Sequence, residues 1–208
     1  MGSESPQVSS QDSRPEGATE PVTELLGGIA RQEPGAWDRL LAIVEADLRR
    51  IAHLQLRGHS AAETLQTTAL VNEAYLRLAR PGGGSYQDRV HFLAVASRAM
   101  RQILVDRARG RAAVKRGSGL APLDLDGREL AAPERSGELL ALDQALIELE
   151  RVEPRLGRVV EMRFFGGMTF EEVGDVLALS DRTIKSDWRK ARAFLEGRLA
   201  AQGIGSTA

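Results

Sequence analysis

Apolar residues recur at intervals of three and four along two stretches of the chain. In the first stretch this spacing predicts three amphipathic helices, over residues 37–51, from Thr64 to about Leu78, and over residues 90–109. Such spacing places the apolar side chains on one face of each helix. We therefore expect a bundle of three or four helices, roughly 90 residues long, which is large enough to form a core.

The second stretch repeats the helical period. Leucines recur from Leu139 to Leu149, and apolar residues recur again from Leu156 to Phe164, with Pro154 between the two runs. No segment alternates apolar and polar residues for long enough to form a strand. The pattern predicts an all-α fold with two small helical domains, residues 22–111 and 137–202.

Three segments lack this periodicity. Residues 1–21 are rich in Ser, Gln, Glu, Pro and Gly, and we expect a disordered tail because they cannot bury enough apolar surface. Residues 112–136 contain repeated glycines and prolines together with several acidic residues. They are expected to form an acidic, flexible linker between the domains. Residues 203–208 are expected to form a C-terminal tail.

A helix-turn-helix motif is indicated near the C-terminal end. Thr169 and Glu172 have the spacing of a capping box, which starts a short helix. Ala178 and Leu179 then turn the chain, and Ser180 can cap a second helix. The polar residues of this second helix are the candidate DNA contacts: Arg182, Thr183, Lys185, Ser186, Arg189 and Lys190. The alternative is an ordinary helical hairpin with a charged exterior.

The net charge of −1 hides two basic segments. Residues 98–116 carry seven bases against one acid, and residues 182–192 carry five bases against one acid. Because polyanions are bound by local rather than net charge, the two segments indicate two contacts with nucleic acid. Solvated helix faces in an arginine-rich chain would give the same counts.

Several classes of chemistry are disfavoured by what the sequence contains. There is no cysteine, so disulfides, thiolate metal sites and a cysteine nucleophile are excluded. The three histidines have no ligand spacing, and Gly82–Gly84 lacks the Lys and Ser or Thr of a phosphate loop. No apolar run reaches the roughly 18 residues of a membrane span, and no secretory signal is evident. We expect a cytoplasmic protein that is not an enzyme, holds no cofactor or metal and does not insert into membranes.

The motifs resemble a known family. Residues 171–191 are similar to region 4 of bacterial sigma factors. Residues 63–80 read ETLQTTALVNEAYLRLAR, which resembles region 2.2, and residues 91–117 resemble regions 2.3 and 2.4. The resemblance, to the extracytoplasmic-function (ECF) sigma factors, covers about residues 22–199. Two positions depart from the usual motif. Gly174 is expected to loosen its helix, and Ala178 replaces the usual turn glycine.

The resemblance implies a transcription initiation factor that binds core RNA polymerase and directs it to promoters. The region 2.2-like helix would dock on the clamp coiled coil of the largest subunit through Leu70, Asn72, Glu73, Leu76 and Arg77. A plain core role is the alternative for Leu70 and Leu76. The basic helix after it would open the −10 element, with Arg101 and Gln102 reading bases and with phosphate contacts from Arg98, Arg107, Arg109 and Arg111. The helix-turn-helix would bind the −35 element.

Promoter DNA and core polymerase are therefore the expected partners, and the family also allows for an anti-sigma factor. The free protein is expected to be a monomer. A stand-alone helix-turn-helix regulator is the alternative function, and it would bind duplex DNA without polymerase.

Overall fold

The computed structural model describes residues 19–56, 63–80, 86–118 and 133–204. Within these ranges the chain forms α-helices and one π-helix, and it forms no strand, which confirms the all-α prediction. The helices follow one another as α1 (Thr19–Ala30), α2 (Ala36–Leu56), α3 (Glu63–Leu78), α4 (Arg89–Ser118), α5 (Pro133–Val152), α6 (Pro154–Val160), the π-helix η2 (Glu161–Phe165), α7 (Phe170–Leu177) and α8 (Asp181–Ala201).

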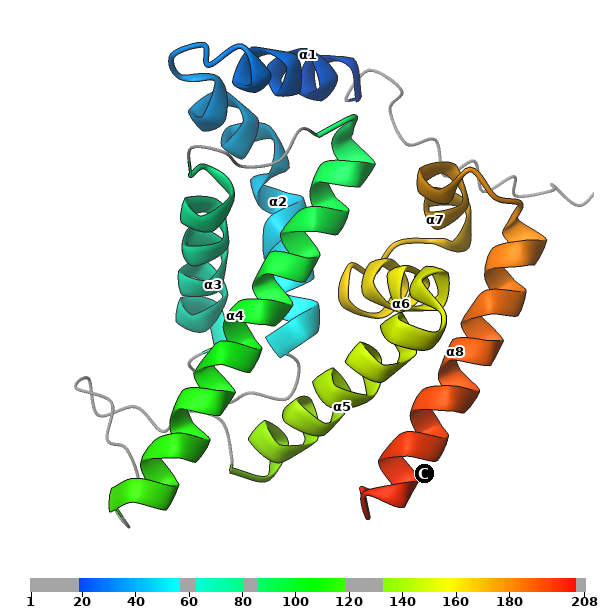
Figure 1. The fold of residues 1–208 in the computed structure, drawn as a ribbon. Coiled ribbons are helices and arrows are strands. Elements are labelled where there is room, and N and C mark those ends of the chain that lie inside the picture. Colours follow the sequence, from blue (N-terminus) through cyan, green and yellow to red (C-terminus); the bar gives the residue numbers. More distant parts are fainter. Residues whose placement is uncertain (1–18, 57–62, 81–85, 119–132, 205–208) are drawn as a thin grey trace, which may run out of the picture.

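The N-terminal unit is a bundle in which α2, α3 and α4 run side by side beneath α1 (Figure 1). The predicted apolar stripes meet at its centre, where these side chains are buried: Leu40, Val44, Leu48 and Ile51 of α2, Leu70 and Ala74 of α3, and Met100 and Ile103 of α4. Burial of these stripes against one another supplies the main driving force for folding of the unit.

Helix α1 was not among the predicted helices. Val22 and Leu26 are nevertheless buried, and Leu25 and Ile29 pack against the same cluster. These four residues have the i, i+3, i+4, i+7 spacing of an amphipathic helix, so the signal was present in the sequence. It begins within the segment expected to be a tail, because Thr19 is already helical.

The edges of the linker also differ from the expectation. Helix α4 continues to Ser118, and α5 begins at Pro133, so both ends of the 112–136 segment are helical. Proline is well suited to a first helical position, since the amide it lacks would have no partner there. Residues 1–18 of the predicted tail, the Gly82–Gly84 run, the linker centre at 119–132 and the C-terminal residues 205–208 lie outside the described residues.

The C-terminal unit places α5 and α8 on either side of α6, around Leu146, Leu149, Val160 and Leu195. It does not stand apart from the N-terminal bundle. Met162 of η2, Val173 of α7 and Met168, which lies between these two helices, belong to the same buried cluster as the bundle's core residues. The two units predicted from the sequence therefore pack against each other.

The helix-turn-helix follows the predicted local chemistry. The Thr169 amide donates to Glu172 Oε2 at 2.8 Å, and the Glu172 amide donates to Thr169 Oγ1 at 3.1 Å, which confirms the capping box. Ser180 caps α8 by accepting from the Thr183 amide at 3.3 Å. Each cap satisfies a backbone donor that the first helical turn leaves unpaired.

The turn between the two helices requires close backbone approach. Ala178 is left-handed, with φ 52° and ψ 45°, and the Leu179 amide donates to the Gly174 carbonyl at 2.9 Å. A Cβ on Gly174 would lie 2.7 Å from the Leu179 carbonyl oxygen. The expectation that Gly174 loosens α7 is therefore corrected, because only glycine leaves room for this turn.

Helix α8 is fixed against α6 by an ion pair between the buried Asp187 and the partly exposed Arg155. Asp187 is 1% exposed on the inner side of α8, beside the apolar Ile184 and Ala191. Arg155 donates to it through both Nε, at 2.7 Å to Oδ2, and Nη2, at 3.1 Å to Oδ1. A bidentate fork of this kind constrains rotation of the helix as well as its position.

Replacing Ala178 with glycine should raise the free energy of unfolding by about 1 kcal/mol, because a Cβ disfavours the left-handed conformation. The matched control is Ala193→Gly, an exposed position within α8, which should lower the same quantity by about 1 kcal/mol. Urea denaturation of both variants measures the difference. Equal losses of stability would mean that the turn is not left-handed in solution.

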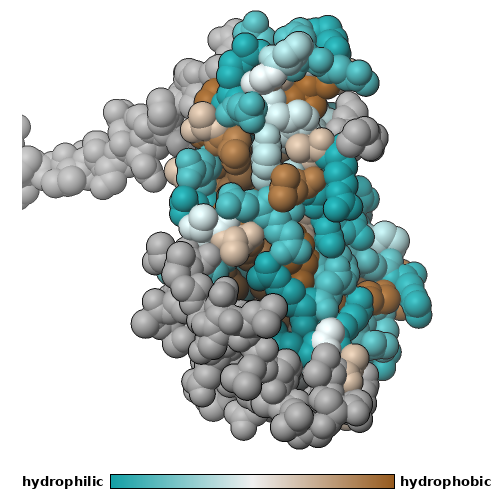
Figure 2. All heavy atoms as spheres, turned by 90° about the vertical axis from the view of Figure 1, so that its left-hand side faces the viewer, coloured by the Kyte–Doolittle hydropathy of each residue, from teal (hydrophilic) through white to brown (hydrophobic). Residues whose placement is uncertain are grey.

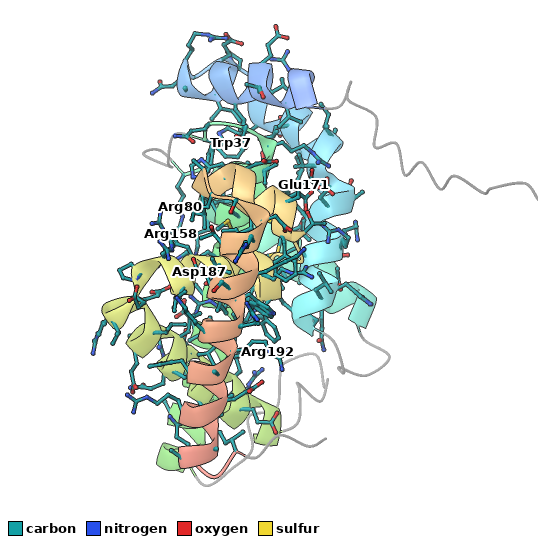
Figure 3. All side chains as sticks on the ribbon, turned by 90° about the vertical axis from the view of Figure 1, so that its right-hand side faces the viewer. Trp37, Arg80, Arg158, Glu171, Asp187 and Arg192 are labelled. Carbon is teal, nitrogen blue, oxygen red and sulfur yellow. The ribbon has the colours of Figure 1, made fainter. Side chains whose placement is uncertain are left out.

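Replacing Arg155 with alanine should lower the free energy of unfolding by about 1–2 kcal/mol, because the buried Asp187 side chain would lose both hydrogen bonds from the partly exposed Arg155. Arg158→Ala, on the same helix and exposed (Figure 3), should change it by less than about 0.5 kcal/mol. Thermal or urea denaturation compares the two. If both variants lost the same stability, the fork to Asp187 would not be the cause.

Candidate nucleic-acid and protein interfaces

The outward face of α8 is basic and accessible. Arg182, Lys185 and Arg189 are exposed, and with Phe170, Asp181 and Trp188 they line a groove at the N-terminal end of the helix. Lys190 is exposed beside them, and α8 lies at the front of the molecule in Figure 3. Lys185 Nζ is 2.7 Å from Asp181 Oδ2, and such a solvent-exposed pair contributes little stability.

Two of the residues predicted on this face are less accessible. Thr183 and Ser186 are half-buried, and Thr183 Oγ1 lies 2.8 Å from Ser180 Oγ. Thr183 therefore contributes to the start of α8 as well as to its surface. The opposite side of this helix is apolar, with Ile184, Ala191 and Leu195 buried.

The basic residues of α4 are paired mainly with acids from elsewhere in the fold. Arg98 Nη2 lies 3.9 Å from Glu150 Oε2 of α5. Arg109 Nη2 donates to Asp143 Oδ2, also of α5, at 2.8 Å. Arg107 pairs with Glu73 of α3. Arg98, Arg107 and Arg109 thus each face a carboxylate, and the side chains of all three remain partly exposed to solvent.

Arg101 is the centre of the most buried ionic cluster among the described residues. Its Nε donates to both carboxylate oxygens of Glu161, at 2.9 and 3.1 Å, and its Nη1 donates to Asp143. The side chains of Arg101, Asp143 and Glu161 are 5%, 4% and 7% exposed. The Arg101 guanidinium also lies 5.3 Å from the centre of the Phe165 ring. In this arrangement Arg101 does not face solvent.

The charge of Arg101 is maintained by its partners. Burial alone would lower the pKa of Arg101, but the charge and hydrogen bonds of Glu161 and the charge of Asp143 raise this pKa above its ordinary value. The guanidinium is therefore ionised in its buried position. By contrast, burial and the nearby charge of Arg107 lower the pKa of Arg111.

Gln102 and Asp106 form a smaller polar group on α4. Gln102 Nε2 donates to Asp106 Oδ1 at 3.0 Å, and Arg77 Nη2 donates to Asp106 Oδ2 at 3.2 Å. Desolvation raises the pKa of Asp106, but these two hydrogen bonds and the charges of Arg77 and Arg109 lower it overall. The pairs link α3 to α4, so the predicted polymerase and promoter surfaces share an edge.

The predicted docking residues of helix α3 differ in their exposure to solvent. Leu70 is fully buried in the bundle core, so its predicted place on the docking surface is corrected: the i, i+4 spacing to Ala74 puts it on the inner face. Leu76 is 63% exposed and Asn72 is exposed, whereas Glu73 and Arg77 are half-buried. Figure 2 shows this side of the molecule, where apolar patches are set among polar atoms.

Sequence reasoning missed the acids that pair with the basic helix. Asp143, Glu150 and Glu161 were not singled out, and no local signal identifies Glu161, which is 60 residues from Arg101. Asp143 and Asp187 do carry a weak signal. Each is a charged residue at an apolar position of its helical stripe, three residues from Leu146 and from Ile184 respectively.

Groups that would support other chemistry are sparse in the described ranges. Within these ranges, no group of three or more His, Asp or Glu side chains could hold a metal ion. His91 accepts a hydrogen bond from the Gln87 amide at 3.2 Å, and His59 lies outside the described residues. No helix of the described part is long and apolar enough to cross a membrane.

Comparison with known families found one whose model spans both helical units. A family model described as ECF sigma factor matches residues 19–201, which include both helical units. Comparison with individual proteins of curated function found no match. The family consists of transcription initiation factors, whose partners are RNA polymerase and promoter DNA. The chain belongs to the ECF sigma factors.

Proposed function

We propose that the protein binds core RNA polymerase through α3, opens the −10 element with α4 and binds the −35 element with α8. The observation that carries the proposal is the basic face of α8, which lies toward solvent because the capped turn and the ion pair between Arg155 and the buried Asp187 fix the helix. Family membership supports action on polymerase in the cytoplasm. The finer assignments rest on the positions of individual side chains.

The −35 assignment is supported by the geometry of α7 and α8. The capped N-terminal end of α8 carries Arg182 and Lys185, and Arg189 follows one turn later on the same exposed side. Residues near the start of a recognition helix contact base edges, whereas residues further along hold phosphates. Arg182 and Lys185 are therefore proposed to read sequence, and Arg189 and Lys190 to hold the backbone.

The polymerase contact is proposed for the exposed part of α3. Leu76 presents an isolated apolar side chain between Asn72 and Arg77, and a large apolar group so exposed gains free energy when a partner covers it. Glu73 and Arg77 flank this position and are already oriented by Arg107 and Asp106. An apolar centre with a charged rim suits recognition of a coiled-coil surface.

The −10 assignment needs a change in the arrangement of the two units. Arg101 can contact a base only if Asp143 and Glu161 leave its guanidinium. Arg98 and Arg109, which are more exposed, could reach phosphates with smaller changes. We therefore propose that α5 and η2 move away from α4 when the promoter strand binds.

Replacing Leu76 with aspartate should weaken holoenzyme formation at least about tenfold, because a charge would replace the apolar centre of the contact. The matched control is Ile43→Asp on α2, a comparably large aliphatic side chain that is 41% exposed and should leave binding unchanged. Fluorescence anisotropy with purified core polymerase measures affinity, and circular dichroism checks helix content. Wild-type protein that binds a duplex promoter tightly without polymerase would indicate a stand-alone regulator instead.

Replacing Arg182 with alanine should relax sequence preference at one position of the −35 element, at a cost of about 1–3 kcal/mol for the preferred base. Lys190→Ala should weaken transcription from all sequences alike and reduce its salt dependence. Transcription with core polymerase from a promoter library randomised around −35 separates the two effects. The same sequence preference in both variants and in the wild type would mean that this face of α8 supplies only charge.

A further inference from the structure

We infer that the groove at the start of α8 recognises thymine, through contact of Phe170 and Trp188 with the C5-methyl group of that base. The inference rests on the proposed binding of −35 DNA by α8. It goes beyond the charged contacts of that proposal, because it assigns the groove an apolar part in sequence recognition. The occupant is the major-groove edge of a base pair that contains thymine.

The groove combines two aromatic side chains with a charged rim. It is lined by Phe170, Asp181, Arg182, Lys185, Trp188 and Arg189. The two aromatic residues are half-buried, and the four charged residues are exposed. The three cations suit a polyanion such as DNA. The two rings carry no charge, and their apolar surface gains free energy when an apolar group covers it.

Base edges in the major groove of duplex DNA offer one apolar group to such a surface. The bases of a duplex are stacked, so a protein in the major groove meets their edges and not their faces. These edges carry hydrogen-bond donors and acceptors, together with the C5-methyl group of thymine. The exposed cations match the phosphates and the polar edge atoms, and the two rings match the methyl group.

Cations from two helices already flank the Phe170 ring, which disfavours stacking of an unpaired base on it. The Arg163 guanidinium of η2 lies 4.5 Å from the ring centre, and Lys185 Nζ of α8 lies 5.8 Å from it. Both distances are within the range of a cation–π interaction. Arg163 is itself held, because its Nη1 donates to the Met168 carbonyl at 2.5 Å. The ring therefore has a fixed position, and it offers DNA apolar surface for contact with a small group.

Trp188, the second aromatic residue of the groove, is fixed by the core. Its half-buried side chain packs against both buried clusters, the one shared with the N-terminal bundle and the one inside the C-terminal unit. The preceding residue, Asp187, receives the two hydrogen bonds from Arg155 that hold α8. Because both rings are held in place by the protein, the groove exists before DNA binds, and little ordering of side chains opposes the contact.

The test removes the methyl group from the DNA, because a change of Phe170 alone would also release Lys185 from its ring. Duplex promoters randomised around −35 are made in two pools, one with thymine and one with deoxyuridine, which lacks only the methyl group. Holoenzyme that contains the full-length protein selects sequences from each pool. The affinity of the holoenzyme for the best thymine-containing site is then measured with either base at each thymine position.

Wild-type holoenzyme should enrich thymine at one or more −35 positions, and deoxyuridine at such a position should weaken binding about fourfold, the effect of burying one methyl group. Phe170→Ala should bind the two duplexes equally, whereas Phe170→Leu, which keeps an apolar side chain, should still prefer thymine. The matched control is Phe164→Ala, which removes a ring that is 56% exposed on η2 and should keep the fourfold ratio.

Equal affinity of the wild-type holoenzyme for thymine and deoxyuridine at every −35 position would overturn the inference and leave the proposed −35 contact intact. A methyl effect that persists in Phe170→Ala would place the contact elsewhere and would overturn it as well. Failure of the proposed function looks different, because no −35 sequence would then be selected from either pool. Circular dichroism checks helix content, and the comparison of the two bases with wild-type protein needs no variant to fold.

Discussion

The guanidinium of Arg101 lies between two helical units, and its charge can be buried there only because two carboxylates come from the far unit to meet it. Asp143 and Glu161 are buried for the same reason, so none of the three groups is tolerated alone. Arg109 supplies a second cation to Asp143 and completes the neutralisation. The relative position of the units therefore depends on a balance of charge as much as on the apolar side chains around it.

The same requirement operates on a smaller scale inside the C-terminal unit. Asp187 faces inward from α8, and the position of α6 beneath it follows from the need to bring Arg155 within reach. The carboxylate on the inner side of α8 favours one rotation of that helix, since both hydrogen bonds from Arg155 form only in that orientation. Because Asp187 pairs with Arg155 on the inner side of α8, the opposite side, with Arg182, Lys185 and Arg189, lies exposed to solvent.

Local rules accounted for most of the helices and for the motif near the C-terminal end. The apolar period predicted α2, α3 and most of α4, and the pair Thr169 and Glu172 predicted the start of α7. What the sequence could not predict was contact between distant residues. From the sequence, Arg101 was expected to be an exposed base of a basic helix, because its partners Asp143 and Glu161 are 42 and 60 residues away. Leu70 was expected to be a docking residue because resemblance to a motif does not distinguish the buried face of a helix from its exposed face.

Helix α4 is one unbroken helix of 30 residues, and its stiffness has a consequence for the size of the site it offers. From Arg98 to Arg109 the axis advances about 16 Å, at 1.5 Å per residue. Phosphates along one strand of a B-form duplex advance about 3.4 Å per step, so this row of cations measures about five nucleotides in that geometry. Because the helix is unbroken, the distance between these cations is fixed. Under the proposed role of α4, substitutions would alter which bases the helix prefers, but they would not change the length of the stretch that these cations can contact.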